Sequence, residues 1–87
     1  MKIWKYELSR ASMSTTISTP TNSKILTVQV QKGVPVVWVL CSEELSEEDH
    51  EIVIYKTGHS VPDEPGRYIG TFQMCDGLVI FHAFEVK

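Results

Sequence analysis

The stretch that most constrains the fold runs from Lys24 to Ser42, KILTVQVQKGVPVVWVLCS. Two runs rich in β-branched residues flank Lys32-Gly33, where the glycine can supply the positive φ of a tight hairpin turn. The second run, Val34–Cys41, is apolar on both faces, which is typical of a central strand that is covered on both sides. The sequence therefore predicts an antiparallel hairpin around which the rest of the chain folds.

A two-residue loop would determine which side chains share a face of this hairpin. We expect one apolar face, formed by Leu26, Val28, Val30, Pro35, Val37 and Val39. We expect a mixed opposite face, formed by Ile25, Thr27, Gln29, Gln31, Val34, Val36, Trp38 and Leu40. The apolar face is the one predicted to point toward the core.

Other stretches of the chain also have the composition of strands bounded by turns or loops. In chain order they are Met1–Leu8, Met13–Thr19, His50–Lys56, Arg67–Cys75 and Leu78–Val86. Ser42 is a candidate N-cap for a single helical turn, and no segment is long enough for a substantial helix. We therefore predict one all-β domain over residues 1–87, a small β-sandwich or partly closed barrel of about seven short antiparallel strands.

The last two of these stretches form a second hairpin around Asp76-Gly77, the strongest turn signal in the chain. One face is expected to pair Phe72 with Phe81, Gly70 with Ala83 and Met74 with Val79. The other face is expected to pair Thr71 with His82, Gln73 with Ile80 and Ile69 with Phe84. The two small residues of the first face leave a notch in the core layer that a large side chain such as Trp4 or Trp38 would fill.

Composition narrows the classes of function. The net charge is −3, and the segment Glu43–Asp49 holds five of the eleven acidic residues. A uniformly basic surface for long nucleic acid is therefore absent, and no apolar run is long enough to span a membrane. Cys41 and Cys75 lack paired spacing and follow no leader sequence, so we expect free thiols in a reducing cytoplasm.

Small size and unpaired edge strands favour self-association. We expect a symmetric homo-oligomer, most simply a dimer. The candidate contact surfaces are the stretches Met1–Leu8 and Met13–Thr19.

The sequence shows no pattern typical of a catalytic or metal site. His50, His59 and His82 lie far apart, and no GxSxG, HExxH or phosphate-binding glycine loop occurs. His82 is expected to be a structural residue bonded to Thr71 or Tyr6 and not a general base. We therefore expect no catalytic residue, no metal, no cofactor and no enzymatic activity.

The loop Thr57–Gly66 is the main candidate for a binding site. We expect Thr57, Gly58 and His59 at its start, together with Arg67 after its end, to form one wall of a pocket for a phosphate-bearing molecule. The alternative is that Gly58 only starts the turn and that His59 points into solvent.

Trp38 is the fifth candidate ligand-binding residue. It lies beside Thr27 and Gln29 on the mixed face of the first hairpin. It is therefore either a core residue or a stacking platform, with an amide at its edge, for a base or another flat ring.

Four stretches of the sequence together resemble a family of short uncharacterised proteins encoded by bacteriophages and prophages. They are KILTVQVQKGVPVVWVL, YKTGHSVP, YIGTFQ and LVIFHAFE, and the last three follow the pattern YxTGHxxP, YIGTFQ and LVxFHxFE. The likeness covers nearly the whole chain. It implies a viral protein that acts in the host bacterial cytoplasm, and it implies no activity.

Two classes of function remain open. The first is a non-catalytic protein that binds and sequesters a small anionic molecule, plausibly a nucleotide signal of bacterial anti-phage defence. The alternative is a protein-interaction module that inhibits a host or phage enzyme through a sheet edge or through the acidic segment Glu43–Asp49.

Overall fold

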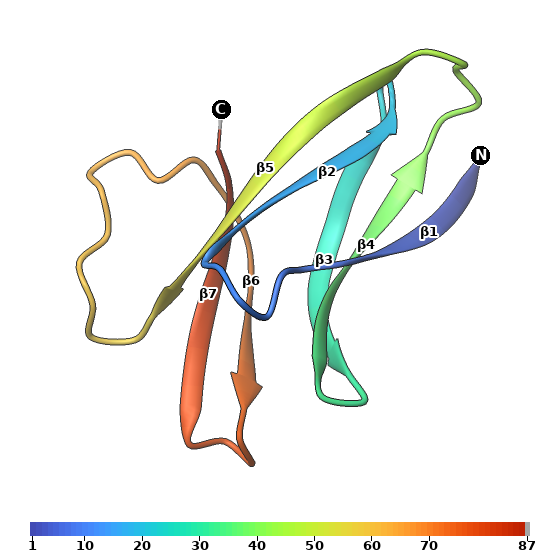
Figure 1. The fold of residues 1–87 in the computed structure, drawn as a ribbon. Coiled ribbons are helices and arrows are strands. Elements are labelled where there is room, and N and C mark those ends of the chain that lie inside the picture. The colour runs from blue at the N-terminus through green and yellow to red at the C-terminus, as the bar shows by residue number, and fades with distance from the viewer. Residues whose placement is uncertain (87) are drawn as a thin grey trace.

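A computed structural model describes residues 1–86, which form seven strands and no helix (Figure 1). The strands are β1 (Lys2–Glu7), β2 (Ser14–Pro20), β3 (Lys24–Gln31), β4 (Val34–Cys41), β5 (Glu47–Lys56), β6 (Arg67–Met74) and β7 (Val79–Val86). The predicted all-β fold class is confirmed.

The strands form two antiparallel sheets that face each other as a sandwich (Figure 1). The strand order is β1-β4-β3 in the smaller sheet and β2-β5-β7-β6 in the larger sheet. As predicted, β4 is the central strand of its sheet and β2 is an edge strand. Because no backbone ladder joins the two sheets within the described residues, the fold is a sandwich and not a closed barrel.

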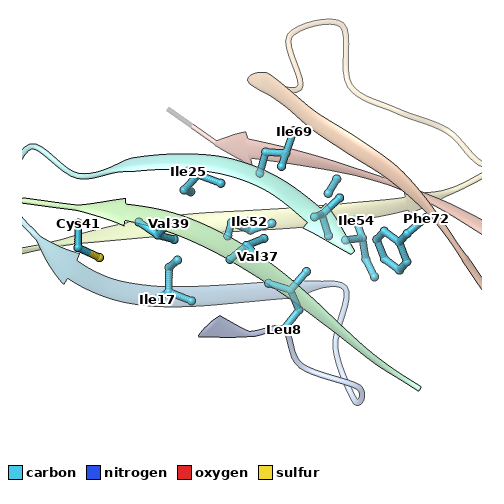
Figure 2. Close-up of a cluster of buried hydrophobic side chains, with 12 residues drawn as sticks. Leu8, Ile17, Ile25, Val37, Val39, Cys41, Ile52, Ile54, Ile69 and Phe72 are labelled. Carbon is cyan, nitrogen blue, oxygen red and sulfur yellow. The ribbon is translucent and has the colours of Figure 1, made fainter. Parts of the chain in front are cut away.

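Buried side chains from both sheets fill the space between them (Figure 2). The residues of this core are Leu8, Ile17, Ile25, Val28, Val37, Val39, Cys41, Ile52, Ile54, Ile69, Phe72 and Ala83. Removal of these side chains from water is the main force that holds the two sheets together.

Both predicted hairpins are present. Lys32 and Gly33 have φ values of 51° and 80°, which are the two successive positive values of a type I′ turn. The second turn is longer than the two residues predicted, because residues 75–78 separate the paired residues Met74 and Val79, and Cys75, Asp76 and Gly77 all have positive φ values, of 53°, 55° and 85°.

A β-bulge at Leu26 reverses the alternation at the start of β3. The register shifts between Ile25 and Thr27, so that Ile25 lies opposite Val39. Ile25 is consequently only 1% exposed, whereas Leu26 is 40% exposed. The predicted faces were wrong for these two residues, because a bulge inserts one unpaired residue and turns the preceding side chains to the other face.

A second bulge lies at Ile69 in β6. Tyr68 and not Ile69 is opposite Phe84, and Ile69 points into the core. The predicted Ile69–Phe84 pair was therefore wrong. The other five predicted pairs of this hairpin are confirmed: Phe72–Phe81, Gly70–Ala83, Met74–Val79, Thr71–His82 and Gln73–Ile80.

The two bulged strands, β3 and β6, are neighbours across the seam between the sheets. Gly70 permits this approach, because a Cβ atom at that position would lie 2.9 Å from Val28 Cγ1. Val28 thus occupies the predicted notch beside Ala83. The expectation that a tryptophan fills the notch was wrong, since Trp4 is 56% exposed and Trp38 lies on the outer face of the smaller sheet.

Strand β5 begins at Glu47, earlier than the predicted start at His50. Three acidic residues of the segment Glu43–Asp49 therefore belong to a strand that pairs with β2. Residues 42–46 contain no helical turn, so the prediction of a turn capped by Ser42 was wrong. Hydroxyl and amide donors accommodate the acidic side chains, for example the Asn22 N–H, which donates to Glu48 Oε1 at 2.7 Å.

The bulge at Leu26 predicts an inverted pair of mutational effects. Ile25→Ala should lower the free energy of unfolding by about 2–5 kcal/mol, because it removes a buried side chain. Leu26→Ala should lower it by less than about 0.5 kcal/mol, because its side chain is largely exposed. Urea unfolding of both variants checks this, and a larger loss for Leu26→Ala would indicate a β3 strand without the bulge.

Candidate functional site

Thr57, Gly58 and His59 form a tight turn directly after β5. The Thr57 hydroxyl donates to the Ile80 carbonyl at 3.2 Å, and the His59 N–H donates to the Lys56 carbonyl at 3.0 Å. Gly58 has a φ of 90°, and both Gly58 and His59 are exposed. This geometry is that of the alternative interpretation, in which Gly58 starts the turn and His59 points into solvent.

His82 occupies the outer face of the larger sheet beside this turn. Hydrogen bonds join its Nδ1 to Thr71 Oγ1 at 2.9 Å and its Nε2 to Thr57 Oγ1 at 2.7 Å. The predicted bond to Thr71 is confirmed, and Thr57 takes the place proposed for Tyr6. Both ring nitrogens therefore have partners, and the hydroxyl of Thr57, a predicted ligand-binding group, is bonded to other residues of the protein.

Arg67 lies far from the turn. Its Nη2 donates to the Ile25 carbonyl at 2.9 Å and to Glu85 Oε1 at 3.2 Å. Thr57 bonds to Ile80 on the same strand β7, so the two partners are about 16 Å apart along that strand. The structure does not bring Arg67 together with Thr57, Gly58 and His59.

Arg67 belongs instead to a charged cluster with Glu85 and His50. Glu85 Oε2 is hydrogen-bonded to His50 Nδ1, while His50 Nε2 is buried without a partner among residues 1–86. Burial raises the pKa of Glu85, but the hydrogen bonds and charges of His50 and Arg67 lower it by more, so the pKa lies below its ordinary value of 4.5. Sequence reasoning missed this cluster, although His50 and Glu85 continue the inward alternation of the buried residues Ile52 and Ala83.

Trp38 is half-buried on the outer face of the smaller sheet, within a ladder of side-chain hydrogen bonds. Its Nε1–H donates to Gln29 Oε1 at 2.8 Å, and Lys5 Nζ donates to Gln31 Oε1 at 2.7 Å. The second bond spans β4 and helps to cover Val36, which is 1% exposed although it faces outward. Because both amide oxygens are engaged, the NH₂ groups of the two glutamines remain as donors.

A groove of about 510 Å³ lies beside Trp38, along the seam between β3 and β6. Its lining is Val28, Gln29, Val30, Gln31, Trp38, Thr71, Phe72 and Gln73. An indole flanked by amide donors is suited to a flat ring with acceptor atoms on its edge. Of the five predicted ligand-binding residues, Trp38 alone borders this groove.

Comparison with known proteins assigns a family but no activity. A family model described as a domain of unknown function, DUF7352, matches residues 1–87. The chain belongs to the DUF7352 family. No curated protein and no solved structure matches this DUF7352 chain. Its function therefore has to be argued from the geometry of the site.

Three further features of the DUF7352 chain concern metal sites, membrane spans and cysteines. Within residues 1–86, no three His, Cys, Asp or Glu side chains are placed so that they could hold a metal ion. The same part of the chain has no helix long and apolar enough to cross a membrane. Both cysteines are free thiols, with Cys41 buried and Cys75 exposed.

The depressed pKa of Glu85 predicts a pH-dependent contribution to stability. Glu85→Gln should lower the free energy of unfolding by about 1–2 kcal/mol at neutral pH, because it removes a charged hydrogen-bond partner of His50 and Arg67. A carboxylate with a lowered pKa stabilises the fold above the unfolded-state pKa and loses this effect as the pH falls through the folded-state value.

The difference in free energy of unfolding between the wild type and Glu85→Gln should therefore shrink as the pH falls below 4.5, the ordinary pKa of a glutamate side chain. Urea unfolding at a series of pH values measures it. Asp63→Asn, in the exposed loop after β5, is the matched control and should cause no change at any pH. A difference for Glu85→Gln that stays constant into acid would contradict the ionic role of Glu85.

Proposed function

We propose that this protein is a non-catalytic module that binds a small anionic molecule through a flat ring stacked on Trp38. The observation that carries the proposal is the hydrogen bond from Trp38 Nε1 to Gln29 Oε1, which fixes the indole and one amide side by side. These two bonds leave the NH₂ group of Gln29 as a donor beside the indole and that of Gln31 as a donor in the same groove. Such donors match the ring nitrogens and carbonyl oxygens of a nucleobase.

The anionic part of the ligand has a partner in Lys5. Its ammonium group is bonded to Gln31, which lines the groove, and it carries three donors, of which this bond uses one. An ammonium group one hydrogen bond away from a residue that lines the groove supports a ligand with a phosphate. Stacking of a base on an aromatic side chain contributes about 1–3 kcal/mol, so ring and phosphate together support binding without any reactive group.

A nucleotide is thus the ligand class that we propose, and sequestration is its proposed use. The resemblance of the sequence to phage-encoded proteins extends this to a nucleotide signal of anti-phage defence in a bacterial host. That extension depends on the resemblance alone, whereas the ligand class depends on Trp38, Lys5 and the glutamine ladder.

The free edge of β1 favours a second candidate, a protein-interaction surface. Ile3 and Trp4 are 58% and 56% exposed on this edge strand. Antiparallel pairing of two β1 strands about a two-fold axis at Trp4 would place the two indoles opposite each other and double the three-stranded sheet. The proposed partner is therefore a second copy of the chain.

The nucleotide proposal is tested by fluorescence, because Trp4 and Trp38 are the two tryptophans of the chain. In a Trp4→Phe variant, Trp38 is the single tryptophan, and a nucleotide that stacks on it should quench the tryptophan emission with a dissociation constant below about 100 μM. The probes are a panel of cyclic and linear nucleotides, with ribose 5-phosphate as the probe that lacks a base.

The matched control is Trp38→Phe, in which the emission of Trp4 should not change with any probe. Gln29→Leu and Lys5→Gln, both at exposed positions, should weaken binding of the nucleotide by about tenfold each. The proposal is wrong if no member of the panel quenches Trp38, or if ribose 5-phosphate binds as well as the nucleotides.

Self-association through β1 is tested by light scattering. The wild-type protein should have the mass of a dimer at micromolar concentration, and Trp4→Ala should shift the mass toward a monomer, because it removes the aromatic contact at the centre of the interface. Leu78→Ala, which alters an exposed residue of the β6–β7 turn, is the control and should remain a dimer. A monomeric wild type would remove this candidate.

A further inference from the structure

A separate apolar cleft is lined in part by Ile54 and Phe72. These two side chains lie together at one end of the core (Figure 2). The volume of the cleft is about 370 Å³, within the range of small-molecule sites. The residues around it are Ser9, Arg10, Ala11, Ser12, Met13, Pro35, Ile54, Phe72, Met74, Cys75, Val79 and Phe81. It shares only Phe72 with the groove beside Trp38.

The walls of the cleft combine a fixed part with an adaptable part. Phe72 and Phe81 stack with their ring centroids 5.6 Å apart. Met13 and Met74 add unbranched thioether side chains, which adjust to irregular apolar shapes. A flexible aliphatic chain fits such walls better than a rigid polar molecule does.

Arg10 is the single charged residue that lines the cleft. It is exposed, and no hydrogen bond or salt bridge joins its guanidinium to another residue within 1–86. The loop that carries it is held by Ser9, whose hydroxyl accepts the N–H groups of Ala11 and Ser12 at 3.1 Å each. An ordered loop thus places an uncompensated positive charge beside an apolar cavity.

We infer that this cleft binds an amphipathic monoanion, with a carboxylate on Arg10 and an aliphatic chain between Met13 and the two phenylalanine rings. Arg is the side chain best suited to a carboxylate, because its guanidinium donates two parallel hydrogen bonds. The volume of the cleft corresponds to roughly a dozen water-sized units of ~30 Å³, which accommodates a chain of about ten carbons. A medium-chain fatty acid has this size and charge.

Decanoate, below its micelle concentration, is the probe. Calorimetry should detect its binding, and it should slow alkylation of Cys75, the exposed thiol that lines the cleft, while the buried Cys41 stays unreactive throughout. Decylamine, with the same chain and the opposite charge, should bind at least about tenfold more weakly. Arg10→Gln should lower the affinity for decanoate by about tenfold and leave the affinity for decanol unchanged, because only the carboxylate contacts Arg10.

A series of chain lengths separates a site of defined size from adsorption to an apolar surface. Affinity should rise from hexanoate to decanoate and should not rise further to hexadecanoate. A continuous rise with chain length, equal binding of decylamine, or unchanged alkylation of Cys75 would each overturn the inference. Met13→Gln, in the exposed loop, should weaken the binding of every probe that has the aliphatic chain and leave the nucleotide quenching of Trp38 unchanged. The two proposals can therefore be contradicted separately.

Discussion

The close contact between β3 and β6 is the constraint on which the rest of the structure depends. Gly70 lets Val28 approach the backbone of β6, and the Arg67 guanidinium bonds across the seam to the Ile25 carbonyl. Both strands carry a bulge at this level, which turns Ile25 and Ile69 inward to fill the space between the sheets. Within residues 1–86, the seam is thus closed by packing and the side-chain bridge of Arg67, without a backbone ladder between the sheets.

This closure explains why a charged cluster lies within the sandwich. Arg67 reaches the Ile25 carbonyl across the seam with a side chain that remains 42% exposed, whereas Glu85 and His50 are less exposed, at 21% and 11%. Glu85 compensates the charge of Arg67 and in turn binds His50, and the cluster lowers the pKa of Glu85 despite its partial burial. Arg67, which was predicted to bind a ligand, is thus engaged in contacts with β3 and β7.

The strands and both hairpins were predictable because they depend on local signals, namely alternation along the chain and glycine at the turns. The bulges at Leu26 and Ile69 were not predictable, since each bulge residue follows another large side chain, Ile25 or Tyr68, and either member of the pair can face the core. The register of the first hairpin places Gln29 near Trp38, so this part of the candidate site could be predicted from the sequence. The partners of Arg67 could not be predicted, because they depend on which strands of the two sheets become neighbours.

Beyond Gly70 the seam continues toward the two hairpin turns. Because the side chains of β6 alternate between its two faces, the outer face of β6 is polar in this part and the inner face is apolar. Thr71 and Gln73 point outward and make the groove beside Trp38 polar, whereas Phe72 and Met74 point inward and make the cleft apolar. Phe72 is the one residue that borders both hollows. One strand, β6, therefore supplies polar side chains to one hollow and apolar side chains to the other.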